Sequence, residues 1–203
     1  MTLNIALIIG AYLLGSVPFA LVIGKGIYHV DVRAAGSGNI GTTNVFRVLG
    51  KGPGIMVFAG DLAKGFIPVF LATRYVDQDQ AALVAVLTAG AAIAGHTWPV
   101  YLRFHGGKGV ATGGGTILAL MPLLFVIAFA IFWAALLASR YVSVSSLTAV
   151  TFLAIAVIVT GQPLPYIIFT LVGAAVIFYA HRSNLARLSK GTENRVAFPW
   201  NKK

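Results

Sequence analysis

The sequence predicts an all-α integral membrane protein, a seven-transmembrane-helix bundle with its polar site at the cytoplasmic face. The 203-residue chain is 58% hydrophobic and only 10% charged, whereas a soluble domain carries about 25% charged residues. Its mean hydropathy is +0.88. Apolar runs alternate with short polar segments, and about 20 apolar residues suffice to cross the hydrocarbon core. The length suits one compact domain over residues 1–203.

The first apolar run, residues 2–24, predicts the first span. Its first basic residue, Lys25, follows the run, whereas a cleaved signal peptide has its positive charge before the apolar region. We therefore expect a retained helix that enters from outside and ends at the cytoplasm. Pro18 is expected to kink this helix or to start its second half.

The second and third spans are predicted over residues 55–74 and 81–101. Asp61 and Lys64 interrupt the second span at a spacing that places them on one helix face. Ionisable groups at membrane depth are costly, so the pair is interpreted either as a structural ion pair near the inner interface or as a device that orients the adjacent polar loop. The third span is rich in alanine and glycine, which lets helices approach closely.

Residues 110–138 carry no charge, and one straight helix of this length would measure roughly 43 Å. Because the hydrocarbon core is only about 30 Å thick, we divide the run at Met121-Pro122 into spans over residues 109–120 and 123–138. Two crossings also return Arg140 to the side of the other basic loops. The last spans are residues 147–160 and 165–180, which gives seven spans with the N-terminus out and the C-terminus in. Nearly every basic residue is then cytoplasmic, as the positive-inside rule requires, with Arg74 the exception.

The first polar loop, residues 36–47, reads Gly-Ser-Gly-Asn-Ile-Gly-Thr-Thr-Asn-Val-Phe-Arg. Glycines leave backbone N–H groups open to a ligand, short polar side chains add donors, and an arginine fork suits phosphate or carboxylate. The loop matches G-x-G-x-x-G, but no strand or βαβ unit accompanies it, so a dinucleotide site is excluded. We interpret it as an anion cradle, against the alternative of a flexible connection, with a short helix over residues 44–49 presenting Arg47.

A second glycine-rich stretch, Gly106-Gly107-Lys108-Gly109, is expected to face the first polar loop. It is not a Walker motif, because Leu102 and Gly109 occupy positions that need glycine and Ser or Thr. It still suits an anion, since backbone donors and a lysine precede the N-terminus of a helix. The alternative is an ordinary positive-inside lysine.

Further polar candidates lie at later helix ends. Ser143 is a ligand candidate, while Ser145 or Ser146 is expected to cap the sixth span. A lone histidine at a helix end is more often structural, but His181 is followed closely by Asn184 and either binds phosphate or acts as a general base. The tail segment, residues 191–195, is either a lid or a solvated end.

Composition excludes several classes of site. The five carboxylates are too few and too scattered for an oxygen-rich metal cage, and no histidine or cysteine pattern indicates zinc. The chain has no cysteine and therefore no thiol chemistry. The net charge of +10 is explained by the positive-inside bias and an anionic ligand rather than by nucleic acid. We expect no metal and no cofactor.

Taken together, these motifs resemble the bacterial integral-membrane acyl-phosphate:glycerol-3-phosphate acyltransferases, the PlsY type. The resemblance runs nearly from end to end and is carried by residues 36–44 with Arg47 and Gly50, by 95–96 and 104–112, by 140–143 and by 181–184. Thr42 and His105 stand where the family often has other residues. Neither departure touches a charged position.

The resemblance implies transfer of a fatty acyl group from acyl phosphate to the primary (sn-1) hydroxyl of glycerol 3-phosphate, which gives lysophosphatidic acid. It implies a multi-pass protein of the bacterial cytoplasmic (inner) membrane, without cofactor. A soluble synthase would supply the acyl phosphate through transient contact. The catalytic residues implied are Lys108, Arg47, His181 and Ser37, and the substrate-binding residues are Gly38, Asn39, Thr43, Asn44, Gly106, Gly107, Ser143 and Asn184.

In this reading Arg47 and Lys108 hold the phosphates and offset charge on the departing phosphate, while catalysis is mostly positioning. The proton goes either to His181 or to a substrate phosphate. A His-x4-Asp pair is missing, because Tyr101 stands at the position of the carboxylate after His96.

The alternative function is a membrane transporter or channel for a small anion. Transporters place their site near the midplane in broken helices, whereas here the basic and glycine-rich segments all fall on one face. A phosphotransferase would need an aspartate-rich metal motif, which the sequence lacks.

Overall fold

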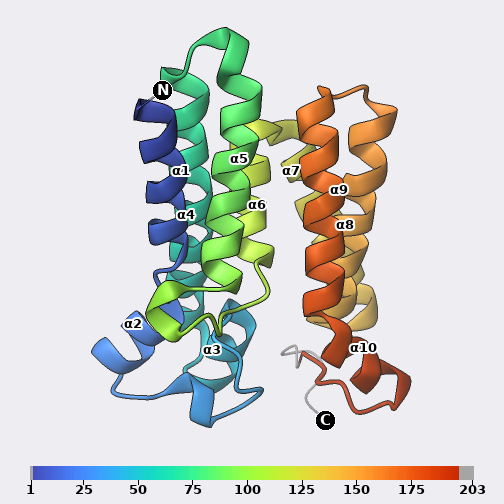
Figure 1. Cartoon of the computed structure of the whole chain (residues 1–203). Coiled ribbons are helices and arrows are strands. Elements are labelled where there is room, and N and C mark those ends of the chain that lie inside the picture. Colours follow the sequence, from blue (N-terminus) through green and yellow to red (C-terminus); the bar gives the residue numbers. More distant parts are fainter. Residues whose placement is uncertain (1, 197–203) are drawn as a thin grey trace. The chain divides into compact units, whose positions relative to one another are not determined.

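A computed structural model describes residues 2–196, and this part of the chain is helical without any strand (Figure 1). The all-α prediction is therefore confirmed for the described residues. The α-helices are α1 (Thr2–Gly15), α2 (Phe19–Gly26), α3 (Thr42–Val48), α4 (Lys51–Tyr75), α5 (Gln78–Thr97), α6 (Val110–Leu120), α7 (Pro122–Ser139), α8 (Val142–Val159), α9 (Leu164–Ala180) and α10 (Arg182–Ser189). Two short 3-10 helices, η1 (Val32–Ala34) and η2 (Val100–Leu102), lie in the connections.

The helices form two compact units that divide at the start of α7. The first unit, up to residue 122, contains α1 to α6, and the second, from residue 123, contains α7 to α10. Within the first unit α1, α4, α5 and α6 pack against one another. Figure 1 shows α2, α3 and the α5–α6 connection together at one end of this group. Within the second unit α8 packs on α9.

Four helical segments among the described residues are long and apolar enough to cross a membrane. They are Lys51–Tyr75, Gln78–Leu102, Pro122–Ser139 and Val142–Val159. Two bent pairs also pass as single spans, α1 with α2 at 43° and α9 with α10 at 53°. The helix α6 is about 16 Å long, which is short of a core of about 30 Å. The structure thus supports four to six spans, and the count of seven and the orientation remain predictions.

The break between α1 and α2 confirms the expectation for Pro18. This residue has no N–H and directly precedes α2. The carbonyl of Val17, exposed by the break, accepts a hydrogen bond of 2.8 Å from the Lys64 ammonium on α4. A buried lysine therefore stabilises the broken backbone.

Glycines at helix crossings explain the tight packing of the first unit. A Cβ on Gly15 would overlap the Ala92 carbonyl oxygen, so glycine at this position allows α1 to pack directly against α5. A Cβ on Gly65 would overlap the Thr112 carbonyl oxygen, so glycine there allows α4 to pack directly against α6. Small residues thus let backbones approach closely in the way that the composition predicted.

A local apolar core fixes the segment that contains the first polar loop. It consists of buried side chains from α2, η1, the loop, α3 and α4, namely Ala20, Leu21, Ile23, Val32, Ile40, Val45 and Val57. Removing apolar surface from solvent stabilises this arrangement. The loop is therefore anchored on both sides by buried residues.

The division of the long charge-free run is confirmed, because α6 ends at Leu120 and α7 begins at Pro122.

The predicted serine cap of the sixth span is wrong. Helix α8 already begins at Val142, so Ser145 and Ser146 lie inside it and donate to the carbonyls of Tyr141 and Val142. The sequence directly before Ser145 is poor in glycine, and no residue there indicated that the helix begins earlier, at Val142.

Candidate functional site

The first polar loop is organised from within by Asn44. Its Oδ1 accepts a hydrogen bond of 2.7 Å from the Ser37 N–H, and its Nδ2 donates to the carbonyls of Val32 and Ala35 at 2.8 and 3.1 Å. The side chain lies at the start of α3 and is only 1% exposed. Gly36 has a φ of +64°, and a Cβ there would overlap the Asn44 oxygen. Asn44 therefore sets the path of the loop.

The loop presents Ser37 and Arg47 at the surface. Ser37 and Gly38 are exposed, and Gly38 takes a φ of +71° that favours glycine. Arg47 lies exposed in the last turn of α3, which confirms the predicted short helix that carries it. Asn39 stays closer to the backbone, because its Oδ1 accepts from the Gly41 N–H at 2.8 Å.

Thr42 and Thr43 form the first turn of α3, and both are half-buried. The Thr42 Oγ1 is buried without a hydrogen-bond partner in the described structure. The first polar loop thus combines two side chains that shape it, Asn39 and Asn44, with the exposed residues Ser37, Gly38 and Arg47.

The second glycine-rich stretch is hydrogen-bonded to the end of α5. The Gly106 N–H donates to the Thr97 carbonyl and the Gly107 N–H donates to the His96 carbonyl, both at 3.1 Å. Gly109, with a φ of +78°, is the residue before α6. The half-buried Lys108 lies between these fixed points. Figure 1 shows this connection at the same end of the first unit as α3, and direct contact between the two loops stays a prediction.

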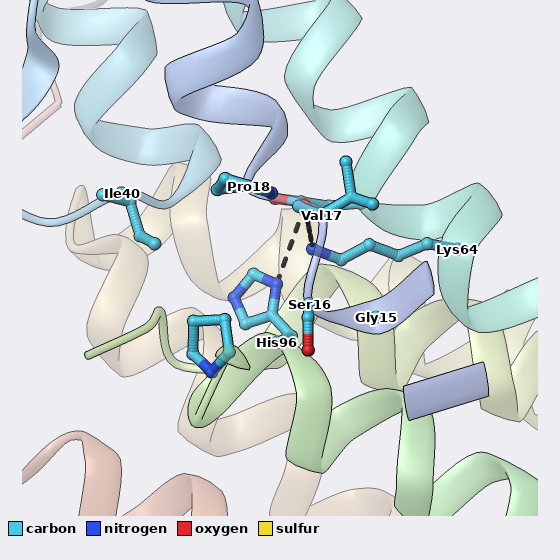
Figure 2. A pocket seen from close by; sticks show the side chains of 9 residues that line it. Gly15, Ser16, Val17, Pro18, Ile40, Lys64 and His96 are labelled. Atoms are coloured by element: carbon cyan, nitrogen blue, oxygen red, sulfur yellow. Dashed lines mark hydrogen bonds and ion pairs between the residues drawn. The ribbon is translucent and has the colours of Figure 1, made fainter. Parts of the chain in front are cut away.

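A cluster of ionisable side chains lies buried beside these loops. Asp61 and Lys64 form an ion pair of 2.9 Å, and His96 Nδ1 lies 3.6 Å from the same Asp61 oxygen. The Thr112 hydroxyl lies 3.1 Å from His96 Nδ1. Figure 2 shows Lys64 and His96 directed into one small recess. The predicted ion pair is confirmed, and its link to His96 is a contact that sequence reasoning missed.

In the second unit, Glu193 gathers two of the predicted substrate-binding residues. Its Oε1 accepts from Ser143 Oγ at 3.0 Å and from Asn184 Nδ2 at 2.6 Å, while its Oε2 accepts from Arg187 Nε at 2.7 Å. Burial works against the charge, but these hydrogen bonds hold the pKa of Glu193 below its ordinary value. The carboxylate therefore stays ionised and fixes Ser143 relative to Asn184.

The tail that carries Glu193 is bound to the α7–α8 junction. The Val196 N–H donates to the Arg140 carbonyl at 2.8 Å, and Arg195 Nε donates to the Tyr141 hydroxyl at 2.8 Å. The alternative of a solvated end is therefore wrong for Glu193, whose side chain is 5% exposed. Sequence reasoning placed Glu193 in the tail segment but missed its contact with Ser143, which lies 50 residues away, and its contact with Arg187. A role as a lid stays a prediction.

His181 lies buried between α9 and α10. Its Nδ1 is 2.8 Å from the Ile177 carbonyl oxygen. Because a carbonyl only accepts, Nδ1 carries the proton in this contact. The two roles expected of His181, phosphate binding and general base, stay predictions.

Comparison with known proteins identifies the class. A family model described as glycerol-3-phosphate acyltransferase matches residues 5–191. Proteins named glycerol-3-phosphate acyltransferase from Rubrobacter xylanophilus and Halalkalibacterium halodurans are 47% and 45% identical over 193 and 200 residues, which cover 95% and 97% of both chains in each comparison.

Two solved structures of PlsY (YgiH), an integral membrane glycerol 3-phosphate acyltransferase, share the fold. The glycerol 3-phosphate form gives a TM-score of 0.90 at 40% identity and covers 96% of each chain. The lysophosphatidic acid form gives 0.88 at 39% identity and covers 96% of this chain and 95% of the other. The protein is thus an integral membrane acyltransferase. Within that class the chain belongs to the glycerol-3-phosphate acyltransferase family, which confirms the resemblance stated from its motifs.

Proposed function

We propose that the protein transfers a fatty acyl group from an acyl phosphate to the sn-1 hydroxyl of glycerol 3-phosphate. The main support is the likeness to PlsY, which was solved in glycerol 3-phosphate and lysophosphatidic acid forms. Each of these matches covers 96% of this chain. Both proposed substrates carry phosphate. The exposed Arg47 and the half-buried Lys108 supply the cationic groups that such substrates need.

In the proposed reaction the glycerol 3-phosphate hydroxyl oxygen attacks the acyl carbonyl carbon. A new ester C–O bond forms, the bond from that carbon to the phosphate oxygen breaks, and inorganic phosphate leaves with the electron pair. Arg47 and Lys108 bind the phosphates and stabilise the charge that develops on the leaving group. The hydroxyl proton passes to His181 Nε2 or to a substrate phosphate.

The other predicted residues have supporting roles in this proposal. Ser37, Asn39 and Thr43 offer short side-chain donors to phosphate, Gly38 lets the phosphate approach the backbone closely, and Asn44 maintains the loop that presents them. Gly106 and Gly107 allow the backbone to approach closely. Ser143 and Asn184 are oriented by Glu193.

The proposed membrane placement has seven crossings, the N-terminus outside and the C-terminus in the cytoplasm, within the bacterial cytoplasmic membrane. The positive-inside distribution of basic residues supports it. The acyl phosphate then reaches the enzyme from a soluble synthase that docks transiently at the inner face. Single cysteines placed in the natural cysteine-free chain at residues 28 and 78 should react with an impermeant thiol reagent from opposite sides.

The decisive experiment is an assay with purified protein in detergent. Transport cannot occur there, because no membrane separates two compartments. Acyl phosphate, acyl-CoA and acyl carrier protein are each supplied with radiolabelled glycerol 3-phosphate, and the position of the acyl group in the product is determined. We expect 1-acyl lysophosphatidic acid from acyl phosphate alone. Equal turnover with acyl-CoA would reject the proposed donor, and absence of any lyso-lipid would favour an anion transporter.

A further inference from the structure

The cluster that surrounds His96 makes contacts that the proposed reaction does not use. We propose that His96 is a positioning residue whose ring supports the Gly106–Gly107 backbone and thereby sets the position of Lys108. This inference rests on the proposed function of Lys108 in binding phosphate. It assigns a role to a buried histidine that lies outside the residues proposed to bind the substrates.

One edge of the His96 ring is fixed by two other helices. Its Nδ1 lies 3.1 Å from the Thr112 hydroxyl on α6 and 3.6 Å from the Asp61 carboxylate on α4. Asp61 is itself held by Lys64 at 2.9 Å. His96 is 6% exposed, and Asp61 and Lys64 are 2% exposed each. Because buried polar groups are costly unless paired, these contacts restrict the ring to one orientation.

The opposite edge of the ring faces Gly107. The three atoms nearest to a Cβ built on Gly107 are all atoms of the His96 ring, and the Cβ would overlap Nε2. Gly107 does not have a positive φ, so its backbone conformation would accept alanine. The ring, rather than the backbone conformation, therefore requires glycine at this position.

Gly106 offers a matched contrast one residue earlier. A Cβ on Gly106 would overlap the His96 carbonyl oxygen and approach Pro99 Cδ at 2.5 Å and the Thr97 carbonyl oxygen at 2.6 Å. None of these atoms belongs to the His96 side chain, so they stay in place when that side chain is shortened. The two glycines thus separate an effect of the ring from a general intolerance of the loop to side chains.

The consequence concerns Lys108, which directly follows Gly107. Its ammonium is placed by a loop whose path depends on the ring beneath it. A displacement of about 1 Å in a group that binds the reacting phosphate can lower the rate by about 10²-fold. Asp61 and Thr112 then influence the position of Lys108 through His96.

The first test is a second-site rescue measured as kcat/KM for each mole of folded, purified protein. His96→Ala leaves the Asp61–Lys64 pair intact, so it does not strand a buried charge. We expect Gly107→Ala to lose about 10²-fold in kcat/KM and the double variant His96→Ala/Gly107→Ala to recover about tenfold of that loss. The matched control, His96→Ala/Gly106→Ala, should be no more active than Gly106→Ala. Absence of rescue at position 107, or equal rescue at both positions, would overturn the proposal.

The second test reads the position of residue 108 without using activity. The chain has no cysteine, so a single Lys108→Cys variant is labelled selectively by a thiol reagent. His96→Ala should speed labelling at position 108 while leaving labelling of a Lys51→Cys control unchanged. An unchanged rate at position 108 would reject the positioning role, even if the wild-type protein forms lysophosphatidic acid as proposed. If the wild-type protein forms no product but the rate changes, the proposed function fails and the structural link remains.

Discussion

The amide of Asn184 donates a 2.6 Å hydrogen bond to the buried carboxylate of Glu193. The two residues are nine positions apart in the chain, and the same oxygen also accepts from Ser143. An anion with converging donors around it is the arrangement by which proteins bind carboxylate or phosphate. Here the chain supplies its own anion, so the contact orders the end of the second unit.

The first prediction concerns the charge of Glu193. Glu193→Gln preserves the shape but weakens the bonds from Arg187 and the other donors, so the free energy of unfolding should fall by about 1–3 kcal/mol. Thermal unfolding in detergent measures the change. Asp31→Asn is the matched control, because Asp31 is a more exposed carboxylate that pairs with Lys25 and Arg33. Equal losses in the two variants would show that the buried contacts carry no special weight.

The second prediction is the pH dependence of that difference. The pKa of Glu193 is lowered in the folded state, so its contribution is fully present above the unfolded pKa of about 4.3. It is lost as the pH falls through the lower folded value. The stability advantage of the wild type over Glu193→Gln should therefore be constant from pH 8 to 5 and shrink below about pH 4. A difference that grows on acidification contradicts the assignment.

The third prediction concerns the buried pair Asp61 and Lys64. Removing one partner leaves a buried charge uncompensated and should cost about 3–5 kcal/mol. Asp61→Asn and Lys64→Met should each lower the unfolding temperature strongly, whereas the double variant should be less destabilised than the sum of both. A double-mutant cycle on purified protein measures this coupling. Additive losses would mean that the 2.9 Å contact contributes little.

Several of these features follow from local sequence and several do not. The division at Met121-Pro122 follows from the length of one apolar run, and the Asp61–Lys64 contact follows from helical spacing. The contact of His96 with that pair depends on how α4 packs against α5. No periodic pattern in a single sequence predicts this packing. The same holds for Glu193, whose partner Ser143 is far away in the chain.

Asn44 illustrates a different limit of sequence reasoning. Its polarity and its place in the first polar loop indicated substrate binding, yet its three hydrogen bonds all go to backbone atoms. One partner is Ser37 within the loop, and the others are Val32 and Ala35 just before it. Asparagine serves both purposes with the same atoms. Only the position of the surrounding carbonyls distinguishes a side chain that shapes a loop from one that contacts a ligand, and a direct contact of Asn44 with substrate stays a prediction.

The fourth prediction follows from those hydrogen bonds. Asn44→Ala should lower the free energy of unfolding by about 1–3 kcal/mol and reduce acyl transfer far more than this loss of folded protein explains, because Ser37 is no longer held. Asn4→Ala, which removes an exposed hydrogen bond to Gln80, is the control and should leave both quantities near wild type. Activity that only tracks the folded fraction would argue against a role of Asn44 in shaping the site.

The fifth prediction concerns the two cations that the proposed reaction requires. Arg47→Ala and Lys108→Ala should each lower kcat for lysophosphatidic acid formation by about 10²–10³-fold, the usual cost of removing one preorganised group that stabilises transition-state charge. Arg47→Lys should recover little, since an ammonium cannot reproduce the planar fork of a guanidinium. Lys51→Ala is the control, because Lys51 is an exposed cation at the start of α4. Full turnover in Arg47→Ala or Lys108→Ala, measured with membranes containing equal amounts of protein, would remove that residue from the proposed mechanism.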